Sequence, residues 1–322
     1  MNNINTKSNT AAQTTEKQAA ANLGPIFVFL SGVSFSMGGL LMKYVSMHPL
    51  AINGVRNAIS AIVVGLFLIL TKHRLKFNRH VLIGALAISL TTALYVYANK
   101  LTTAGNAIVL QFTAPIWVMV FSTIVLKIKP TKLDLAAGAL VIIGVVCFFL
   151  DAVTAGNMLG NALALASGIT YVGVFMMNST PDSDSLSATF FGLLINTLVG
   201  IPFFLSENIA AVPMQTWAAL LILGIVQQGL SYILLNLGLA TTGAIAASLI
   251  SGVEPVLNPI LVAIFYGEVL TPLSFVGAAI VLISIVAYNI IKAGKKIHGD
   301  GVSVSFLPEC FDSKYANSKK TH

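Results

Sequence analysis

Ten apolar runs, each about twenty residues long, constrain the fold of this chain more than any other feature. A helix needs roughly 20 apolar residues, at about 1.5 Å of rise each, to cross the hydrocarbon core of a bilayer. The 322 residues are 56% hydrophobic and 9% charged, whereas a soluble domain has about 25% charged residues. The sequence therefore predicts an all-α integral membrane protein with ten transmembrane helices. We place these helices at residues 25–45, 50–71, 80–99, 104–126, 133–150, 157–178, 186–206, 215–238, 243–266 and 272–292.

The segments before and after the apolar runs are polar. Residues 1–24 are rich in Asn, Thr, Gln and Ala and lack the apolar core of a signal peptide. Residues 293–322 are also polar. We predict that both are disordered tails.

The basic residues predict how the chain is oriented in the membrane. If the N-terminus is inside, fifteen of the 18 Lys and Arg residues fall in tails or inner loops, and only Lys43 and Lys100 fall outside. Cytoplasmic loops carry an excess of Lys and Arg. We therefore predict a multi-pass protein of the cell (inner or plasma) membrane with both termini in the cytoplasm. The net charge of +7 then reflects orientation in the bilayer, and no nucleic-acid partner is expected.

No pattern of a catalytic or cofactor site is present in the sequence. The two cysteines, Cys147 and Cys310, suggest neither a disulfide framework nor a metal site. All five histidines lie in gaps or in the tail, and the chain has no HExxH motif and no P-loop. We expect neither an enzyme nor a built-in ATPase motor, and we expect no cofactor and no metal.

The two halves of the chain resemble each other when the sequence is shifted by 140 residues. Residues 102–151 then lie over residues 242–291 without a gap, and Pro115 coincides with Pro255. The repeat contains five helices, an odd number, so two copies must insert with opposite orientations. The sequence therefore predicts two inverted five-helix repeats, at 25–151 and 157–292. Inverted repeats are typical of secondary transporters, in which the site lies between the repeats near the bilayer midplane.

The ninth apolar run carries an acid at bilayer depth. Glu254 lies near its middle and is followed by Pro255, with Pro259 one turn later. A carboxylate at this depth costs about 2.5–3.5 kcal/mol on insertion scales, and proline removes a backbone donor. This pattern favours a substrate pathway lined by a broken helix, although Glu254 could instead pair with a structural partner. We predict hinges at Pro115, Pro255 and Pro259.

Three segments make the chain similar to a known family. They are INGVRNAISA, with Arg56 in the second helix; YANKLTTAGNAIVLQFTAPIWV; and ATTGAIAASLISGVEPVLNPILVAIFYGEVLT. The chain resembles the ten-helix EamA-type branch of the drug/metabolite transporter superfamily over residues 25–292. The resemblance implies export of amino acids or other small metabolites, and in some members of nucleobase-like or cationic compounds. The first half departs from the second at Ala114, which stands in the place of Glu254.

Arg56 is the basic residue that lies inside an apolar run. It is about 9 Å along the helix from Leu50 and could extend its side chain to the outer interface. Alternatively it could hold a carboxylate, either that of a substrate or that of Glu254. We expect Lys43 and Lys100, at helix ends, to reach the interface.

Polar side chains recur in several apolar runs and define a candidate binding site. Gln228, Tyr232 and Asn236 are spaced by four and form one polar stripe on a helix. Gln227 would point to a different face from Gln228, so we expect one of the two to bind a neighbouring helix. Amides inside membranes serve either as such contacts or as substrate ligands. The candidate substrate-binding residues are Arg56, Tyr95, Asn99, Gln111, Tyr171, Gln228, Tyr232, Asn236 and Glu254.

These patterns predict a secondary transporter that exports a small metabolite by alternating access. One Arg and one Glu among neutral hydrogen-bonding groups suit a small zwitterion, so amino acids are the first expectation. Aromatic or cationic compounds are the alternative, because tyrosines can bind rings and cations. A passive pore is the alternative from a different class. The expected partners are the substrate and the lipid bilayer, and the sequence leaves the oligomeric state open, with a monomer compatible with it.

Overall fold

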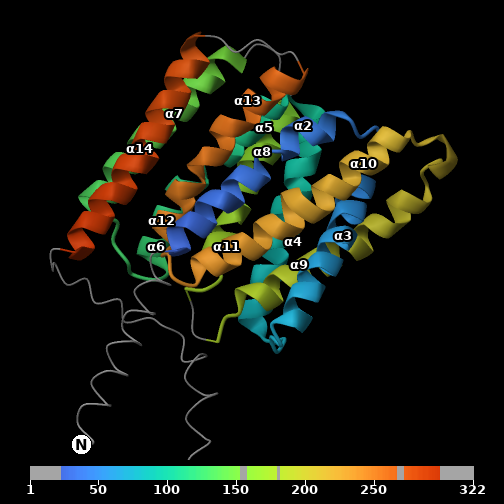
Figure 1. Ribbon diagram of the computed structural model, residues 1–322, viewed down its shortest axis with the longest axis horizontal. Coiled ribbons are helices and arrows are strands. Elements are labelled where there is room, and N and C mark those ends of the chain that lie inside the picture. Colours follow the sequence, from blue (N-terminus) through green and yellow to red (C-terminus); the bar gives the residue numbers. More distant parts are fainter. Residues whose placement is uncertain (1–22, 153–157, 180–181, 267–271, 298–322) are drawn as a thin grey trace, which may run out of the picture.

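The computed structural model describes residues 23–152, 158–179, 182–266 and 272–297. These residues form a bundle of helices and contain no β-strand (Figure 1). Nine helical segments of the described chain are long and apolar enough to cross a membrane. A further helix, α7 (Lys132–Ala152), has 21 residues. The predicted all-helical, multi-span fold is confirmed, whereas most of the two predicted tails lies outside the described residues.

The helices follow the predicted apolar runs with shifts of a few residues at their ends. The first run is helical from residue 23 to residue 35 and again in α2 (Gly38–Lys43). The remaining elements are α3 (Pro49–Leu70), α4 (Arg79–Leu101), α5 (Ala104–Gln111), α6 (Ala114–Ile124), α7, α8 (Met158–Phe175), α9 (Ser185–Leu205), a 3-10 turn (Ile209–Ala211), α10 (Met214–Ile222), a π-helix (Leu223–Leu230), α11 (Ser231–Leu239), α12 (Ala244–Ile250), a 3-10 turn (Ser251–Val253), α13 (Glu254–Tyr266) and α14 (Pro272–Ile297).

Short polar side chains begin several of the helices. Asn78 accepts a hydrogen bond from the backbone N–H of Val81 at the start of α4. Thr103 does the same for Asn106 in α5. Such N-caps satisfy backbone donors that have no partner within the helix. They let the chain turn from one span to the next within a few residues.

The helix breaks in the two halves fall at matching positions. α5 and α12 begin at Ala104 and Ala244, and α6 and α13 begin at Ala114 and Glu254. Both pairs differ by the 140 residues of the sequence repeat. In each case the break precedes the proline, because a proline in the first helical turn loses no intrahelical hydrogen bond. The third predicted hinge, Pro259, lies inside α13, and the helix continues past it.

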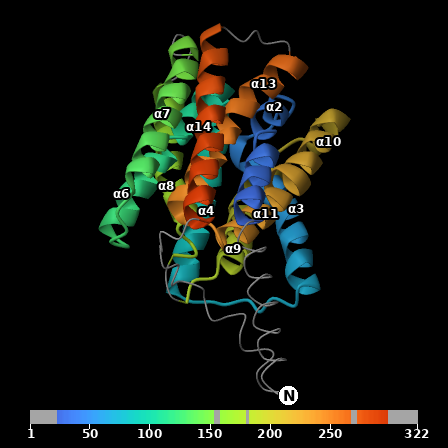
Figure 2. The ribbon, with the colours of Figure 1, turned by 60° about the vertical axis from the view of Figure 1, so that its left-hand side comes forward.

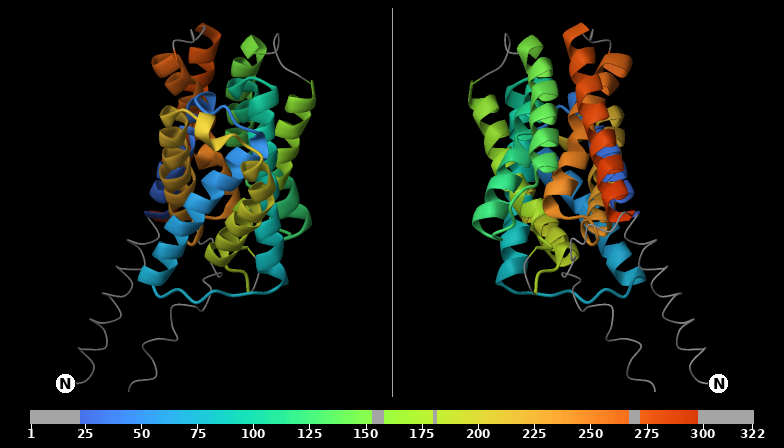
Figure 3. Two further views of the ribbon diagram at one scale, coloured as in Figure 1. Left: turned by 90° about the vertical axis from the view of Figure 1, so that its right-hand side faces the viewer. Right: turned by 90° about the vertical axis from the view of Figure 1, so that its left-hand side faces the viewer.

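The two broken spans cross each other near the middle of the bundle. α5 packs against α13, and α6 packs against α12. The beginning of one span therefore contacts the end of the other, so the spans run in opposite directions. On one side of the bundle α7 and α14 lie alongside each other (Figure 2 and Figure 3, right).

Helices α3 and α9 form one of the most extensive contacts of the bundle. Their backbones meet at a pair of glycines, where a methyl group on Gly54 would lie 2.6 Å from the Cα of Gly200. No side chain larger than hydrogen fits between them, since carbon atoms pack at about 3.5–4.0 Å. This contact fixes the distance between the two helices close to the start of α3 and the end of α9.

A histidine and a carboxylate join the two helices at each end. At one end the backbone N–H of His48 donates to Glu207 Oε1 at 2.6 Å, and the His48 ring stacks on Phe203 at 4.7 Å. At the other end His73 Nε2 lies 2.8 Å from Asp184 Oδ2. We call these contacts the His48 clip and the His73 clip. His73 belongs to the segment between α3 and α4, which runs along the lower edge of the bundle in Figure 3.

Lysine side chains at span ends bind backbone groups of the protein. Lys100 Nζ, at the end of α4, donates to the carbonyl oxygens of Met42 and Val45 at the end of the first span. A cation at a helix C-terminus satisfies carbonyls that lack an intrahelical partner. The sequence placed Lys100 at a helix end and did not predict these bonds to the first span. Because the Lys100 ammonium donates to these two carbonyls, it connects the end of the first span to α4.

Candidate substrate-binding pocket

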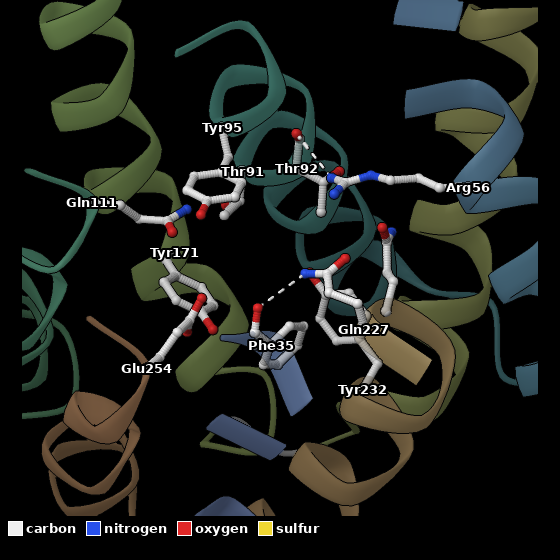
Figure 4. A pocket seen from close by; sticks show the side chains of 11 residues that line it. Phe35, Arg56, Thr91, Thr92, Tyr95, Gln111, Tyr171, Gln227, Tyr232 and Glu254 are labelled. Atoms are coloured by element: carbon white, nitrogen blue, oxygen red, sulfur yellow. Dashed lines mark hydrogen bonds between the residues drawn. The ribbon is translucent and has the colours of Figure 1, made fainter. Parts of the chain in front are cut away.

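A pocket lies among the spans, near the point where the broken helices cross (Figure 4). Its empty volume, which includes space open to solvent, is about 350 Å³. Both halves of the chain contribute to the walls. The lining residues are Phe35, Arg56, Thr91, Thr92, Tyr95, Gln111, Tyr171, Gln227, Gln228, Tyr232 and Glu254.

Arg56 is buried and points into the pocket from α3 (Figure 4). Its side chain is 2% exposed. The Nη2 group donates to Asn53 Oδ1 at 3.2 Å and to the carbonyl oxygen of Thr92 at 3.3 Å, while Nε has no hydrogen-bond partner. This position rules out the alternative that Arg56 reaches the membrane interface. A buried cation without a carboxylate partner is a candidate ligand for an anionic group.

Glu254 enters the pocket from α13, on the side opposite Arg56 (Figure 4). It is 4% exposed and is the first residue of the helix after the 3-10 turn. A carboxylate at a helix N-terminus is stabilised by the helix dipole. Its Oε2 atom has no hydrogen-bond partner, and no ion pair joins Glu254 to Arg56, both of which the structure describes. The pairing of these two residues, which the sequence left open as one alternative, is therefore not made in this conformation.

A network of amides holds Arg56 in place behind the pocket. Asn53 Oδ1 accepts from Arg56 Nη2 and from Asn57 Nδ2, at 3.2 and 2.9 Å. Asn57 Oδ1 in turn accepts from Gln228 Nε2 at 2.6 Å and from Asn196 Nδ2 at 3.4 Å. The network thus connects α3, α9 and the π-helix. Rotating any one of these side chains would leave a buried polar atom without a partner.

The π-helix carries Gln227 and Gln228, both of which line the pocket. In an α-helix adjacent side chains are about 100° apart, and for that reason the sequence predicted that the two would face different surroundings. A π-helix has i→i+5 hydrogen bonds and a wider turn, and π segments occur frequently at functional sites. The backbone N–H of Ser231 accordingly bonds to the carbonyl of Val226.

Aromatic rings form much of the remaining wall. Phe35 and Tyr232 contact each other edge to face, with ring centroids 5.2 Å apart. Tyr171 and Tyr95 lie on the opposite side of the pocket in Figure 4. The hydroxyl group of Tyr95 is buried without a hydrogen-bond partner. The pocket therefore combines apolar faces with several unpartnered polar atoms, a combination typical of sites for small organic molecules.

Comparison with known proteins identifies the family. The model of the EamA-like transporter family matches residues 22–150 and again residues 155–290. The chain belongs to the EamA-like transporter family. A protein of Archaeoglobus fulgidus described as an uncharacterized transporter is 23% identical over 196 residues, which are 60% of this chain and 70% of that protein. A protein of known crystal structure superimposes with a TM-score of 0.71 and 16% identity, covering 83% of this chain and 98% of the other, and this likeness shows the fold alone.

The family and the fold together establish a multi-pass membrane protein that transports small molecules. As an EamA-like transporter, the chain has two copies of the family unit. The pocket lies between elements of both copies, with Arg56 and Gln111 from the first and Tyr171 and Glu254 from the second. The site is thus built by the two halves jointly.

Most of the residues predicted from the sequence come together in this pocket of the EamA-like transporter. Those that line it are Arg56, Tyr95, Gln111, Tyr171, Gln228, Tyr232 and Glu254. Asn99 and Asn236 do not line it. Asn99 Nδ2 donates to the carbonyl of Tyr95 at 3.1 Å, and Asn236 Nδ2 donates to Thr189 Oγ1 at 2.9 Å. The polar stripe, which runs from the π-helix into α11, therefore faces the pocket with Gln228 and Tyr232 but not with Asn236.

The sequence prediction missed four lining residues of the EamA-like transporter: Phe35, Thr91, Thr92 and Gln227. Phe35 ends the first helical stretch just before the break at residues 36–37. The small residues of FSMGG around this break were an available signal. Two adjacent threonines in the middle of an apolar run were another. Gln227 could be placed only with knowledge of the π-helix.

Proposed function

We propose that the protein is a secondary transporter that exports small zwitterionic metabolites, with amino acids as the first candidates, by alternating access. The observation that carries this proposal is the placement of Arg56 and Glu254 on opposite sides of one buried pocket (Figure 4). A small zwitterion would bring one charge to each of them. Charged hydrogen bonds are worth about 1.5–3 kcal/mol each, enough to select for both groups of the substrate.

The arrangement of the helices supports alternating access. Two broken spans with matching breaks cross in opposite directions at the pocket, as inverted repeats require. The excess of Lys and Arg in alternate loops supports an orientation in which the His73 clip faces the cytoplasm and the His48 clip faces outward. Both termini are then cytoplasmic. In this orientation the pocket lies between two ends that can open in turn.

Glu254 is the candidate site for coupling transport to a proton gradient. It is buried, lacks a partner at Oε2, and faces the pocket. A carboxylate in this setting can carry a proton when the substrate is absent and release it when a cationic group binds. If Glu254 keeps one charge state throughout the cycle, the protein is a uniporter.

The aromatic wall favours a second candidate within transport. Phe35, Tyr95, Tyr171 and Tyr232 could stack on an aromatic ring or surround an organic cation. An exporter of aromatic or cationic compounds would use these faces and depend less on Arg56. A passive pore is the alternative from a different class. Saturable flux with counterflow distinguishes a carrier from a pore.

The test is uptake of labelled amino acids into proteoliposomes, with and without an imposed pH gradient. We expect saturable uptake by the wild type that responds to the gradient, and loss of that response in Glu254→Gln. The matched control is Asp182→Asn, the same change of carboxyl to amide on an exposed loop residue.

Three outcomes would change the proposal. Uptake that does not depend on the pH gradient in either protein would still support a carrier but would contradict proton coupling. Folded protein that takes up no amino acid would contradict the substrate class and favour aromatic or cationic compounds. Flux without saturation or counterflow would indicate a pore.

A further inference from the structure

We propose that Gln227 and Gln228 recognise the amino group of the substrate through their side-chain oxygens, and that Asn57 is the positioning residue that fixes the Gln228 amide. This inference rests on the proposed function and deepens it, because it assigns one wall of the pocket to substrates that carry N–H donors. It concerns two oxygens, Gln227 Oε1 and Gln228 Oε1, which are both buried without a hydrogen-bond partner.

The orientation of the Gln228 amide follows from a chain of obligatory hydrogen bonds. The backbone carbonyl of Asn53 can only accept, so the side-chain group that Asn57 places 2.6 Å from it must be the NH₂ group. Asn57 Oδ1 then faces Gln228. Since that oxygen also only accepts, Gln228 must present its NH₂ group there, at 2.6 Å. The oxygen of Gln228 is left facing away from Asn57.

The Gln227 amide is fixed independently by the break in the first span. Its Nε2 group donates to the backbone carbonyl of Phe35 at 3.5 Å, and that carbonyl can only accept. The Gln227 side chain also lies against Gly38, where a methyl group would be 3.0 Å from Nε2. Both contacts restrict the side chain, so the amide cannot easily turn over. Its oxygen therefore remains without a protein donor.

The π-helix is the element that presents both glutamines to one pocket. It is fastened to α3 where Ser60 Oγ donates to the carbonyl of Gly224 at 2.8 Å. Gly224 itself packs against α3, with a hypothetical methyl group 2.5 Å from Ile59 Cβ. With the segment held in this way, Gln227 (Figure 4) and its neighbour in sequence, Gln228, line the same pocket.

Two acceptors without donors determine which chemical group this wall can take. An ammonium group has three N–H donors and no acceptor, so it has enough donors to bond to both oxygens. A carboxylate in the same place would meet two further acceptors and would be repelled. The wall formed by the π-helix therefore selects for amines, whereas Arg56 offers its donors to the acid group of the substrate.

The experiment measures binding of three related ligands to the purified, detergent-solubilised full-length protein by isothermal titration calorimetry. The ligands are an amino acid, the primary amine that lacks its carboxylate, and the carboxylic acid that lacks its amino group. The variants are Gln227→Met, Gln228→Met and Asn57→Leu. The control is Asn289→Leu, because Asn289 Nδ2 also donates to a backbone carbonyl one turn earlier, at 2.8 Å, but on α14 and away from the pocket.

We expect the Kd for the amine and for the amino acid to rise about tenfold in each glutamine variant, since each loses one hydrogen bond to a charged group. Binding of the acid should stay within about twofold. Asn57→Leu should also raise the Kd for the amine relative to the Kd for the acid. A merely structural defect would weaken the binding of all three ligands to the same extent. Asn289→Leu should leave all three Kd values unchanged.

The two proposals can fail separately in this design. If the amine binds to Gln227→Met and to Gln228→Met as it does to the wild type, recognition by the glutamines is refuted. If the wild type binds the amine through the glutamines but transports no amino acid, the inference holds and the proposed function fails. If the folded wild type binds neither the amine nor the amino acid, both are refuted.

Discussion

Among the side chains that the structure describes, two carboxylates are buried in the helix bundle, and their surroundings differ completely. Glu254 has an oxygen without a partner and faces a cavity. Asp134, at the start of α7, accepts from the Thr131 backbone and hydroxyl at 2.8 Å each and from the Tyr288 hydroxyl at 2.6 Å. Lys292 Nζ lies 3.5 Å away. A carboxylate whose hydrogen bonds are all made by the protein stabilises the structure. A carboxylate oxygen without a hydrogen-bond partner is available to a ligand.

The contrast predicts that Asp134→Asn affects stability and leaves transport intact. The amide cannot accept at all of these positions, so it leaves a buried donor unpaired at a cost of about 1–3 kcal/mol. Thermal unfolding of the detergent-solubilised protein should show a lowered Tm, while the KM for transported substrate is retained. Asp182→Asn, on the loop, should leave the Tm unchanged. A changed KM with an unchanged Tm in Asp134→Asn would contradict this division of roles.

At the scale of single residues, the charged residues of the pocket could be predicted from the sequence, but their hydrogen-bond partners could not. Arg56 and Glu254 could be predicted because a charge inside an apolar run is rare and costly. The partners of Arg56 were harder to find, although Asn53, Asn57 and Ser60 in INGVRNAISA follow helical spacing on one face. Whether Arg56 and Glu254 pair depends on distances between spans, which no single segment encodes.

The elements of the fold are defined by their interruptions as much as by their lengths. The breaks before Pro115 and Pro255 could be predicted, because proline restricts the residue before it and cannot donate within a helix. The break at residues 36–37 and the π-helix were missed, since neither contains a proline. Both bring residues to the pocket that a continuous α-helix would place elsewhere.

The glycine contact between α3 and α9 leads to a prediction at the scale of elements. In Gly200→Ala the new methyl group would overlap the Gly54 backbone, so the helices must separate, at a cost of about 1–3 kcal/mol for overpacking. The Tm should fall, and transport should decrease with it.

The matched control is Gly105→Ala in α5, where a methyl group would meet no atom within 4 Å. Replacing this helical glycine should be neutral or stabilising by about 0.5–1 kcal/mol. Equal effects of the two substitutions would show that the close approach of α3 and α9 is unimportant.

At the scale of the whole molecule, α3 and α9 are joined to each other at both of their ends. The His48 clip and the His73 clip join the same two helices at opposite ends, so the alternating access that we propose would require the release of one clip at a time. Neither clip was predicted from the sequence, because His48 and His73 lie in gaps between the predicted helices and contacts between distant loops leave no periodic pattern.

Weakening the His73 clip should open the end of the bundle that we assign to the cytoplasm. Asp184→Asn keeps an N-cap for α9, since Asn caps as well as Asp, but removes the charge next to His73. The reporter is a cysteine at Ile88, which is fully buried on α4, in a background without Cys147 and Cys310. Its labelling by an impermeant maleimide in inside-out vesicles should become roughly 1.5- to 5-fold faster, which corresponds to a loss of about 0.2–1 kcal/mol, the range for ion pairs near the surface.

Asp182→Asn, two residues away in the same loop, should label like the parent protein. Unchanged labelling in Asp184→Asn would mean that the His73 clip does not control this end.

The Gly54–Gly200 contact divides α3 and α9 into a short and a long segment each, so it can act as a pivot that lies closer to the His48 clip than to the His73 clip. Gly54 is five residues from the first residue of α3 and sixteen from the last, and Gly200 is five residues from the last residue of α9 and fifteen from the first. At about 1.5 Å per residue the short segments measure about 7.5 Å and the long segments about 23 Å. A rotation about this pivot therefore moves the His73 end about three times as far as the His48 end. A small displacement at the His48 clip would therefore accompany a displacement about three times as large at the His73 clip.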